Sequence, residues 1–419
     1  MRKSKKQQIY PMQKNKIHIA IVAPWFPPQT GVAVNRIAAF AKYLKTEETD
    51  ISVFTIAENN TETSANSELC DVYRVSNKAF LKFIKTQTSD TKFLHYSKVL
   101  WNVCIRYFIK DEYRGWQKNT EKKLEQVHAG KPIDVVISSF FPAASHAASY
   151  NFLKDKPKIF WVTDMRDEMS FNTLNSSSVN DYYRKVEQWI NSRANMVTTV
   201  SKPILDKFKV VLKNIDLFAE IRNGYDHDQV PNNHFNDVFT VIYAGTFYGK
   251  RKPDTFFEAV RQLKKEGRIN FSWKLKLIGA NRNFHIPDSL KNNVEFSPFI
   301  PNDKMIPELF NADALLFVNP PTGNTGAFTG KIFEYISTGK PMIPVTVLHD
   351  VAADLISEYG VGTPVDFYDI EGIKQSFLGA AQLWKNKETL QIPVEKIKLL
   401  HRRKQVDILY DAIINNFEK

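Results

Sequence analysis

The segment Gly326–Lys340 (GAFTGKIFEYISTGK) constrains the fold of this chain more than any other part of the sequence. It follows an apolar run, Ala314–Val318, and Pro341 separates it from a second apolar run, Met342–Val345. This order predicts a buried strand, a glycine-rich turn, a helix and another strand, as in a parallel α/β sheet. A helix entered through glycines offers unpaired N–H groups and partial positive charge to an anion. Glu334, one turn into the helix, could accept hydrogen bonds from a sugar hydroxyl at the same place.

A phosphate or diphosphate is the anion that such a turn suits, and a nucleotide-sugar would use both the turn and the carboxylate. The glycines can equally serve tight packing at a strand-turn-helix junction. The loop also resembles a Walker A sequence superficially. Its first glycine is one position too close to Gly330-Lys331, however, and Ile332 stands where Ser or Thr is required. We therefore do not expect an NTPase.

The length of 419 residues predicts two domains of roughly 200 residues each. Only two cysteines, Cys70 and Cys104, are present, which argues against a disulfide scaffold and fits a reducing cytoplasm. No apolar run reaches the roughly 18 residues of a membrane span, and the first residues lack the apolar core of a signal peptide. We expect a cytoplasmic protein.

The alternation of strands and helices occurs twice, which predicts an α/β protein with two Rossmann-like, doubly wound domains facing an interdomain cleft. The chain divides into a basic leader (1–16), a first domain (17–226), a polar linker (227–237), a second domain (238–403) and a C-terminal helix (404–419). That last helix could pack back on the first domain. The predicted strands are Ile17–Ala23, Ile51–Ile56, Val135–Ser138, Ile159–Val162, Met196–Val200, Phe239–Tyr243, Trp273–Ile278, Val294–Phe296, Ala314–Val318 and Met342–Val345. The main predicted helices are Val32–Leu44, Ala143–Leu153, Tyr182–Arg193, one capped by Ser201, Asp254–Lys265, Asp303–Phe310 and Val351–Tyr359.

The net charge of +12 is concentrated in the leader and in residues 78–123, which contain eleven Lys/Arg and four acidic residues. The second region belongs to a mostly helical segment, 78–127, in which aromatic residues alternate with the basic ones. This composition suits docking to an anionic membrane surface, and the protein would then be peripheral on the inner face. Ordinary amphipathic helices with aromatic cores and solvated lysines fit equally well. We do not expect nucleic acid as the partner.

From Lys16 to Ile343 the chain resembles the family-four glycosyltransferases of the two-Rossmann (GT-B) type, in the bacterial branch that builds capsular or O-antigen polysaccharide. The segments that carry the resemblance, in the family's order, are IAIVAPWFPPQTG, WVTDMRDE, ANMVTTVSKP, IRNGYD, VIYAGTFYGKRKP, ADALLFV and TGKIFEYISTGKP. The resemblance implies transfer of a sugar from a nucleoside diphosphate sugar of the UDP or GDP type to an acceptor hydroxyl. The implied acceptor is a polyprenyl-diphosphate-linked oligosaccharide at the inner leaflet, and the implied outcome is retention of anomeric configuration.

The resemblance also implies roles for individual residues. In the first domain, Gly31 would let the backbone approach the donor phosphates. In the second, a basic loop and the glycine-rich turn would hold the diphosphate, Glu334 the ribose, and residues 298–299 the base. The implied donor-binding residues are Gly31, Gly245, Thr246, Arg251, Lys252, Pro298, Phe299, Gly330, Lys331 and Glu334.

Arg251 and Lys252 are also the implied catalytic cations, since they would neutralise the departing diphosphate. Asp164 is the candidate for a polar group at the reacting face, within the branch's Asp-x-Arg-Asp signature formed with Arg166 and Asp167. An arginine between two acids could equally be a structural ion-pair cluster.

The chain departs from the family pattern at two positions. Gly326 stands where the first glutamate of a paired-glutamate motif would fall, and Thr246 replaces a basic residue that often follows the loop glycine. The branch commonly lacks the first glutamate, so activity is still expected. The contact that this carboxylate would make to the sugar hydroxyls is missing.

No metal and no cofactor are expected. Asp226-His227-Asp228 has the Asp-x-Asp form of a metal signature, but its place in a polar linker indicates a solvated turn. The nine histidines show no metal-ligand spacing. Two rival functions remain, a nucleotide-sugar 2-epimerase of the same architecture and a non-catalytic protein that binds an anionic polymer.

Overall fold

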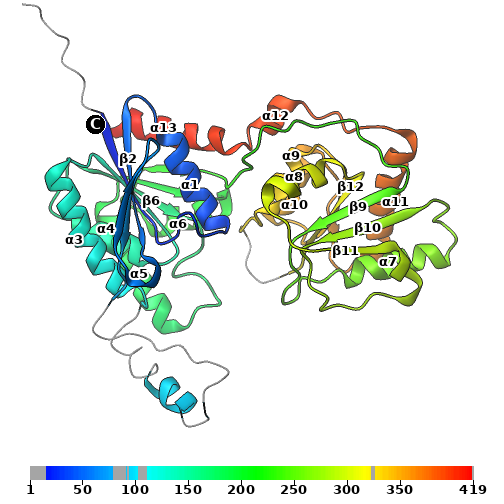
Figure 1. The fold of residues 1–419 in the computed structure, drawn as a ribbon, viewed down its shortest axis with the longest axis horizontal. Coiled ribbons are helices and arrows are strands. Elements are labelled where there is room, and N and C mark those ends of the chain that lie inside the picture. Colours follow the sequence, from blue (N-terminus) through cyan, green and yellow to red (C-terminus); the bar gives the residue numbers. More distant parts are fainter. Residues whose placement is uncertain (1–15, 79–90, 92–93, 102–110, 322–325, 418–419) are drawn as a thin grey trace, which may run out of the picture. The chain divides into compact units, whose positions relative to one another are not determined.

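The computed structural model describes residues 16–78, 91, 94–101, 111–321 and 326–417. Over these ranges the chain is an α/β protein in which helices flank mainly parallel strands (Figure 1). It divides into two compact units, one made of residues 1–164 and 192–195 and the other of residues 165–191 and 196–419.

The first unit is built on strands that run in the order β3-β4-β2-β1-β5-β6. Neighbouring strands are parallel except β3 and β4. The strand bounds are β1 Ile17–Val22, β2 Thr49–Ile56, β3 Thr63–Asn66, β4 Asp71–Val75, β5 Val135–Ser139 and β6 Phe160–Met165. Four consecutive residues of β1, 19–22, are fully buried. Burial on both faces explains why the central strand is a continuous apolar run and does not alternate.

Three helices of this unit are α1 Val32–Leu44, α3 Arg114–Gly130 and α4 Ala144–Leu153. Residues 94–101 form a further helical stretch. The apolar side chains of α1 recur at helical spacing, so one face, including Ile37, Phe40 and Leu44, is buried. The connection from β1 to α1 therefore runs past the carboxyl end of the central strand, where ligands bind in open α/β sheets.

The second unit opens with α5 Ser177–Arg193, β7 Met196–Thr199, α6 Lys202–Val211 and β8 Leu217–Glu220. Strands β7 and β8 pair in parallel. Ser201 occupies the N-cap position of α6 with extended backbone, but its side chain makes no capping hydrogen bond. The prediction that this hydroxyl caps the helix is wrong, because the Ser201 hydroxyl donates to the carbonyl of Gly326 instead, at 2.6 Å.

The second sheet has the order β11-β10-β9-β12-β13-β14 and all its strands are parallel. The strand bounds are β9 Phe239–Ala244, β10 Trp273–Ile278, β11 Val294–Ser297, β12 Ala314–Asn319, β13 Met342–Thr346 and β14 Val365–Asp366. The helices around it are α7 Asp254–Lys265, α8 Asn302–Phe310, α9 Lys331–Ser337, α10 Val351–Tyr359 and α11 Ile370–Asn386.

Side chains of β9 alternate between the two faces of this sheet. Phe239, Val241 and Tyr243 join the apolar cluster that includes side chains of α7 and α11. Ile242 and Ala244 join the cluster that includes side chains of α8, α9 and α10. Helices thus cover both faces of a parallel sheet, which is the doubly wound arrangement.

The chain ends with α12 Val394–Lys398 and α13 Arg402–Phe417. Just before α13, His401 forms a parallel bridge with Tyr225. The backbone of Gly224 passes so close to the Leu400 carbonyl that a Cβ would lie 2.5 Å from it. Two segments that are far apart in the sequence are therefore held side by side at this point.

The predicted fold class is confirmed, since both sheets are predominantly parallel and helices flank them. The domain boundaries at linker 227–237 stay a prediction. Much of the basic segment 78–127 lies outside the described residues. Among the helices that are described, none combines the length and apolar character needed to span a membrane.

Candidate functional site

The residues predicted to bind a donor in the second domain follow the carboxyl ends of its strands. Gly245 comes directly after β9, Pro298 directly after β11, and Lys331 begins α9 after the turn that follows β12. Strand ends of a parallel sheet meet at one edge, so these residues are brought to the same edge.

Gly245 lies beside the ammonium of Lys331 and has a backbone conformation that favours glycine. The backbone of Gly245 has φ 117°, and a Cβ there would lie 2.9 Å from Nζ of Lys331. The Lys331 ammonium lies 4.0 Å from the centroid of the Tyr243 ring. The glycine therefore makes room for a cation over an aromatic face.

Arg251 supplies a second cation close to Lys331. It is only 8% exposed, and its guanidinium donates to the Tyr248 hydroxyl and to Oδ1 of Asn319, each at 3.0 Å. Its Nε is buried and makes no hydrogen bond. Asn319 in turn donates to the carboxylate of Asp350 at 3.3 Å, so an amide separates the guanidinium from that carboxylate.

Neither Arg251 nor Lys331 forms an ion pair with a carboxylate of the described residues. Burial, and then the charge of Arg251, lower the pKa of Lys331 to about 7. The charge of Glu334 acts in the opposite direction and raises the pKa of Lys331. A buried guanidinium and a half-buried ammonium that form no ion pair still repel each other and are costly to desolvate. An anion bound between them would relieve both penalties, and a diphosphate has the charge to do so.

The start of α9, which the sequence predicts to bind an anion, belongs to a short helix. The helix has only seven residues, and Gly330 has φ −55° and ψ −35°, which are ordinary helical dihedrals. A short helix carries a weak dipole, so the side chains of Arg251 and Lys331 are the stronger sources of positive charge. Thr329, two residues before the start of α9, has a buried hydroxyl without a hydrogen-bond partner.

Glu334 lies one turn further along α9 and lines a cavity of about 290 Å³. Burial raises the pKa of its carboxyl, while the charges of Arg402 and Lys331 and a hydrogen bond with Asn302 lower it. A cavity of this size, with a carboxylate, an amide and a guanidinium in its wall, suits a polar ring such as a ribose.

The other predicted residues of this edge are exposed or half-buried. Phe299 is 83% exposed, and its Cα would lie 3.5 Å from a Cβ on Gly279. Pro298 and Thr246 are also exposed, and Lys252 is half-buried. The Thr246 hydroxyl donates to the carbonyl of Gly279 at 3.3 Å. An accessible aromatic ring beside the turn is available for stacking.

In the first unit, Asp164 is fully buried and paired with Arg36 of α1. Nε and Nη2 of Arg36 donate to its two carboxylate oxygens at 3.0 and 2.6 Å, and the Ser139 hydroxyl donates to Oδ2 at 2.7 Å. Both charged side chains are at most 2% exposed. The carboxylate thus forms a buried ion pair with Arg36, which lies outside the predicted cluster of Asp164, Arg166 and Asp167. A role of Asp164 at the reacting face stays a prediction.

The other two residues of the predicted signature are more accessible than Asp164: Arg166 is half-buried and Asp167 is exposed. Gly31 precedes α1 with φ 141°, a conformation that favours glycine. No atom lies within 4 Å of the position that its Cβ would occupy. The space beside Gly31 is therefore open to a ligand.

Asp226 and Asp228 of the linker are both exposed. Oδ2 of Asp226 lies 3.8 Å from Nη1 of Arg402, and Nε2 of His227 lies 2.9 Å from the Ser337 hydroxyl. Within the described part of the chain, no group of three or more His, Cys, Asp or Glu side chains could hold a metal ion. Independence from metal remains a prediction.

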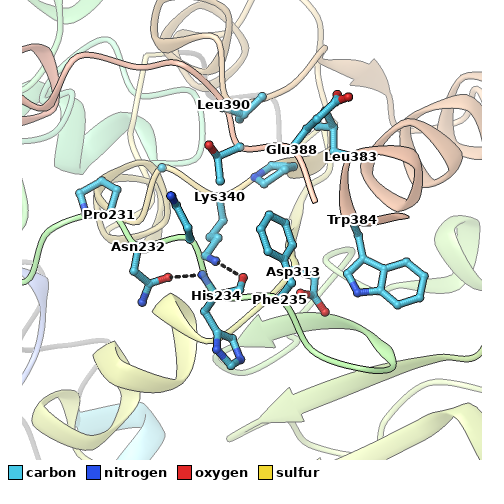
Figure 2. Close-up of a pocket in the computed structure, with 14 residues that line it drawn as sticks. Pro231, Asn232, His234, Phe235, Asp313, Lys340, Leu383, Trp384, Glu388 and Leu390 are labelled. Atoms are coloured by element: carbon cyan, nitrogen blue, oxygen red, sulfur yellow. Dashed lines mark hydrogen bonds between the residues drawn. The ribbon is translucent and has the colours of Figure 1, made fainter. Parts of the chain in front are cut away.

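A further pocket, drawn in Figure 2, lies where the linker packs beside the strand starts of the second sheet. Asp313 and Lys340 lie just before β12 and β13, and Nζ of Lys340 donates to the His234 carbonyl at 2.9 Å. The cavity is about 60 Å³, enough for a few waters. Its polar groups bind the linker, so we assign it a structural role.

Two parts of the site were not identified from the sequence. Arg402 lies 68 positions after Glu334, and Asn302 opens α8, so no local motif links them to the carboxylate. The pairing of Arg36 with Asp164 was also missed, although an arginine on the buried face of α1 was a signal for a buried partner.

No protein-family model matches the chain. No curated protein matches it either. Solved structures do match over almost the whole length. Sucrose-phosphate synthase from Thermosynechococcus elongatus is 13% identical with a TM-score of 0.61, covering 96% of this chain and 100% of that one. HepE of Anabaena, solved with UDP and glucose, is 12% identical with a TM-score of 0.57, covering 95% and 100%.

A protein from Listeria monocytogenes described as a UDP-N-acetylglucosamine 2-epimerase is 11% identical with a TM-score of 0.54, covering 96% of this chain and 97% of that one. Identities this low define the fold and no more. The chain thus has the GT-B fold of two Rossmann-like domains, which glycosyltransferases and this epimerase share.

Proposed function

We propose that this protein is a glycosyltransferase that moves a sugar from a nucleoside diphosphate sugar to an acceptor hydroxyl. The proposal is carried by two cations at the carboxyl edge of the second sheet, the buried Arg251 and the half-buried Lys331. Neither forms an ion pair with a carboxylate of the described residues. Such a pair is costly in the ligand-free protein and becomes favourable when a diphosphate binds.

The chemistry follows from where charge develops. The bond between the anomeric carbon and the diphosphate oxygen breaks, the acceptor oxygen bonds to that carbon, and the acceptor loses its proton. Negative charge grows on the departing diphosphate, where Arg251, Lys331 and the neighbouring Lys252 would meet it. Glu334 would hold the ribose and Phe299 would stack on the base, so the donor is positioned from both ends.

The finer assignment rests on the sequence resemblance. We place the protein among the family-four glycosyltransferases of the polysaccharide branch, acting with retention, without a metal, and on a polyprenyl-linked saccharide. The GT-B fold is compatible with this assignment, and the absence of a carboxylate at Gly326 leaves the identity of the sugar open.

We further propose that the protein works from the cytoplasm as a peripheral protein on an anionic membrane. Within the described residues, support comes from the helical stretch 94–101. Tyr96 is 71% exposed, Leu100 66% and Trp101 44%. Exposed apolar and aromatic side chains within a basic segment are typical of a helix that lies in a membrane interface.

The test is release of nucleoside diphosphate from a panel of UDP- and GDP-sugars, with and without a polyprenyl-diphosphate-linked saccharide. We expect release that depends on the acceptor. Arg251→Gln should reduce the rate of this acceptor-dependent release by about 10²-fold or more, because a donor that stabilises the departing diphosphate is removed. Arg268→Gln, which changes a partly exposed arginine in surface ion pairs, is the matched control and should leave it unchanged.

Two outcomes would contradict the proposal. Interconversion of the free donor sugar without any acceptor, followed by NMR, would assign the protein to the epimerases. Binding of an anionic polymer that weakens steeply with salt, without turnover of any nucleotide-sugar, would show a non-catalytic binding protein.

A further inference from the structure

One neutral side chain, the amide of Asn319, connects the guanidinium of Arg251 to the carboxylate of Asp350. Asn319 is the last residue of β12, and its Oδ1 accepts a hydrogen bond from Nη2 of Arg251 at 3.0 Å. Its Nδ2 donates to Oδ2 of Asp350 at 3.3 Å. All three residues are at most 8% exposed. A buried cation and a buried anion are therefore separated by two hydrogen bonds and do not form an ion pair.

The amide of Asn319 suits this place because its two neighbours have opposite requirements. A guanidinium can only donate hydrogen bonds, and a carboxylate can only accept them, whereas an amide has one group of each kind. The same Nδ2 also donates to the Thr346 hydroxyl at 3.5 Å. An apolar side chain at position 319 would leave a buried donor and a buried acceptor without partners. A carboxylate there would contact Arg251 directly and face Asp350 with a like charge.

Backbone groups fix the carboxylate of Asp350. Its Oδ1 accepts hydrogen bonds from the N–H of Val351 at 2.8 Å and from the N–H of Gly326 at 3.1 Å. The side chain thus caps α10 and holds the beginning of the glycine-rich segment. Its Oδ2 accepts the hydrogen bond from Asn319. The carboxylate therefore has a structural role that does not require a direct contact with Arg251.

The contacts that orient Arg251 are neutral. Besides Asn319, its guanidinium donates to the hydroxyl of Tyr248 at 3.0 Å, and its Nε is buried without a hydrogen-bond partner. No carboxylate of the described residues forms an ion pair with it. An arginine that is already paired with a carboxylate would have to lose or share that partner when an anionic ligand binds. Neutral partners orient the guanidinium and leave its charge available.

We propose that Asn319 is a positioning residue of the donor site, a neutral spacer that orients Arg251 and prevents it from pairing with Asp350. The inference rests on the proposed function and adds a specificity determinant to it. The preference of the site for a diphosphate over an uncharged nucleoside should depend on the amide at position 319, although this side chain makes no contact with the diphosphate itself.

The test exchanges the two side chains, in the double variant Asn319→Asp/Asp350→Asn. The exchange keeps the net charge, the side-chain sizes and an amide–carboxylate hydrogen bond between the two positions. The amide oxygen at position 350 can still accept from the N–H groups of Val351 and Gly326, since asparagine also caps helices well. Only the carboxylate moves, into direct contact with Arg251. Thermal unfolding without ligand should therefore show a folded protein at least as stable as the wild type.

Calorimetric titration of the full chain with UDP, GDP, uridine and guanosine then measures the effect on binding. The exchange variant should bind the diphosphate about 10-fold or more weakly than the wild type, because the ligand must compete with a carboxylate for Arg251. Its affinity for the nucleoside should be unchanged. Asn319→Asp alone should show the same difference. Asn415→Asp adds the same charge at an exposed asparagine of α13 and is the matched control, which should bind both ligands as the wild type does.

Wild-type affinity for the diphosphate in the exchange variant would overturn the proposal and leave Asn319 a structural residue. An equal loss of affinity for the diphosphate and the nucleoside would overturn it as well, because the amide would then shape the site and not govern its charge. If the exchange variant does not fold, Asn319→Asp decides by the same comparison. Failure of the underlying function is a separate result, because the wild-type protein would then bind neither UDP nor GDP.

Discussion

Replacing Lys331 with methionine should make the ligand-free protein more stable while removing its response to a nucleoside diphosphate. The side chain is half-buried against the Tyr243 ring and next to Arg251, and it forms no ion pair among the described residues. Methionine keeps a similar length and removes the charge. A residue that costs stability in the empty protein and contributes to binding is typical of a functional site.

The magnitude follows from the pKa of Lys331, which burial and Arg251 lower from 10.5 to about 7. The ammonium keeps its proton up to about pH 10.5 in the unfolded chain but only up to about pH 7 in the folded protein. The charged lysine therefore lowers the free energy of unfolding, fully below about pH 7 and progressively less as the pH rises to 10.5. At ~1.4 kcal/mol per pH unit the full penalty is roughly 5 kcal/mol. Solvent contact of this half-buried side chain reduces the penalty. We therefore expect Lys331→Met to raise the free energy of unfolding by about 2 kcal/mol.

The assay is thermal unfolding at pH 7 with and without UDP and GDP. A gain of about 2 kcal/mol corresponds to a rise of roughly 4–8 °C for a domain of this size. The wild type should be stabilised by about 2.7 kcal/mol when the ligand is at a hundred times its Kd, and Lys331→Met should not. A variant that is less stable than the wild type and still responds fully to the nucleotide would refute the reasoning.

Lys340→Met is the matched control, since it removes the charge of a buried lysine in the same domain. Nζ of Lys340 donates to the His234 carbonyl, so its loss leaves that hydrogen bond unmade. We expect this variant to be less stable than the wild type and to keep the full response to the nucleotide.

Four other changes have defined outcomes. Glu334→Ala should weaken nucleotide binding and cut transfer by about 10²-fold or more in a folded protein, because the ribose contact is lost, and wild-type turnover would sink this assignment. EDTA should leave transfer unchanged, whereas loss of activity restored by Mg²⁺ would show a metal requirement. Asp164→Asn should cost about 3–5 kcal/mol in chemical denaturation, because Arg36 would keep a buried charge without its partner, and unchanged stability would argue against the ion-pair role. Tyr96→Glu combined with Leu100→Glu should abolish sedimentation with anionic vesicles while preserving transfer to a short water-soluble acceptor, and unchanged sedimentation would place membrane contact elsewhere.

The sequence predicts the second domain well, because buried parallel strands are apolar runs and the helices between them are amphipathic. The bounds of α7, β10 and α10 are as predicted. The short strands β8 and β14 and the helix α11 were not predicted. A strand of two to four residues gives too little periodicity, and the apolar positions of α11 are interrupted by charged residues.

The candidate site could be predicted only where its residues lie close together in the sequence or belong to a recognisable motif. Gly245 and Lys331 were both identified, but their close approach comes from the packing of β9 against α9. The partner of Asp164 lies 128 positions away. Arg402 lines the same cavity as Glu334 because the chain returns to Tyr225, whose carbonyl accepts a hydrogen bond from the Arg402 N–H. Tertiary structure alone determines such neighbours.

Calorimetric titration of the wild-type protein with a nucleoside diphosphate, the monophosphate and the free nucleoside, for both uridine and guanosine, tests the assignment of the cation pair most directly. If Arg251 and Lys331 form a diphosphate site, one of the two diphosphates should bind at least about 10²-fold more tightly than its nucleoside, since charge-assisted hydrogen bonds to two cations are lost without it. Equal affinity for the diphosphate and the nucleoside, or no binding of either diphosphate, would contradict the assignment.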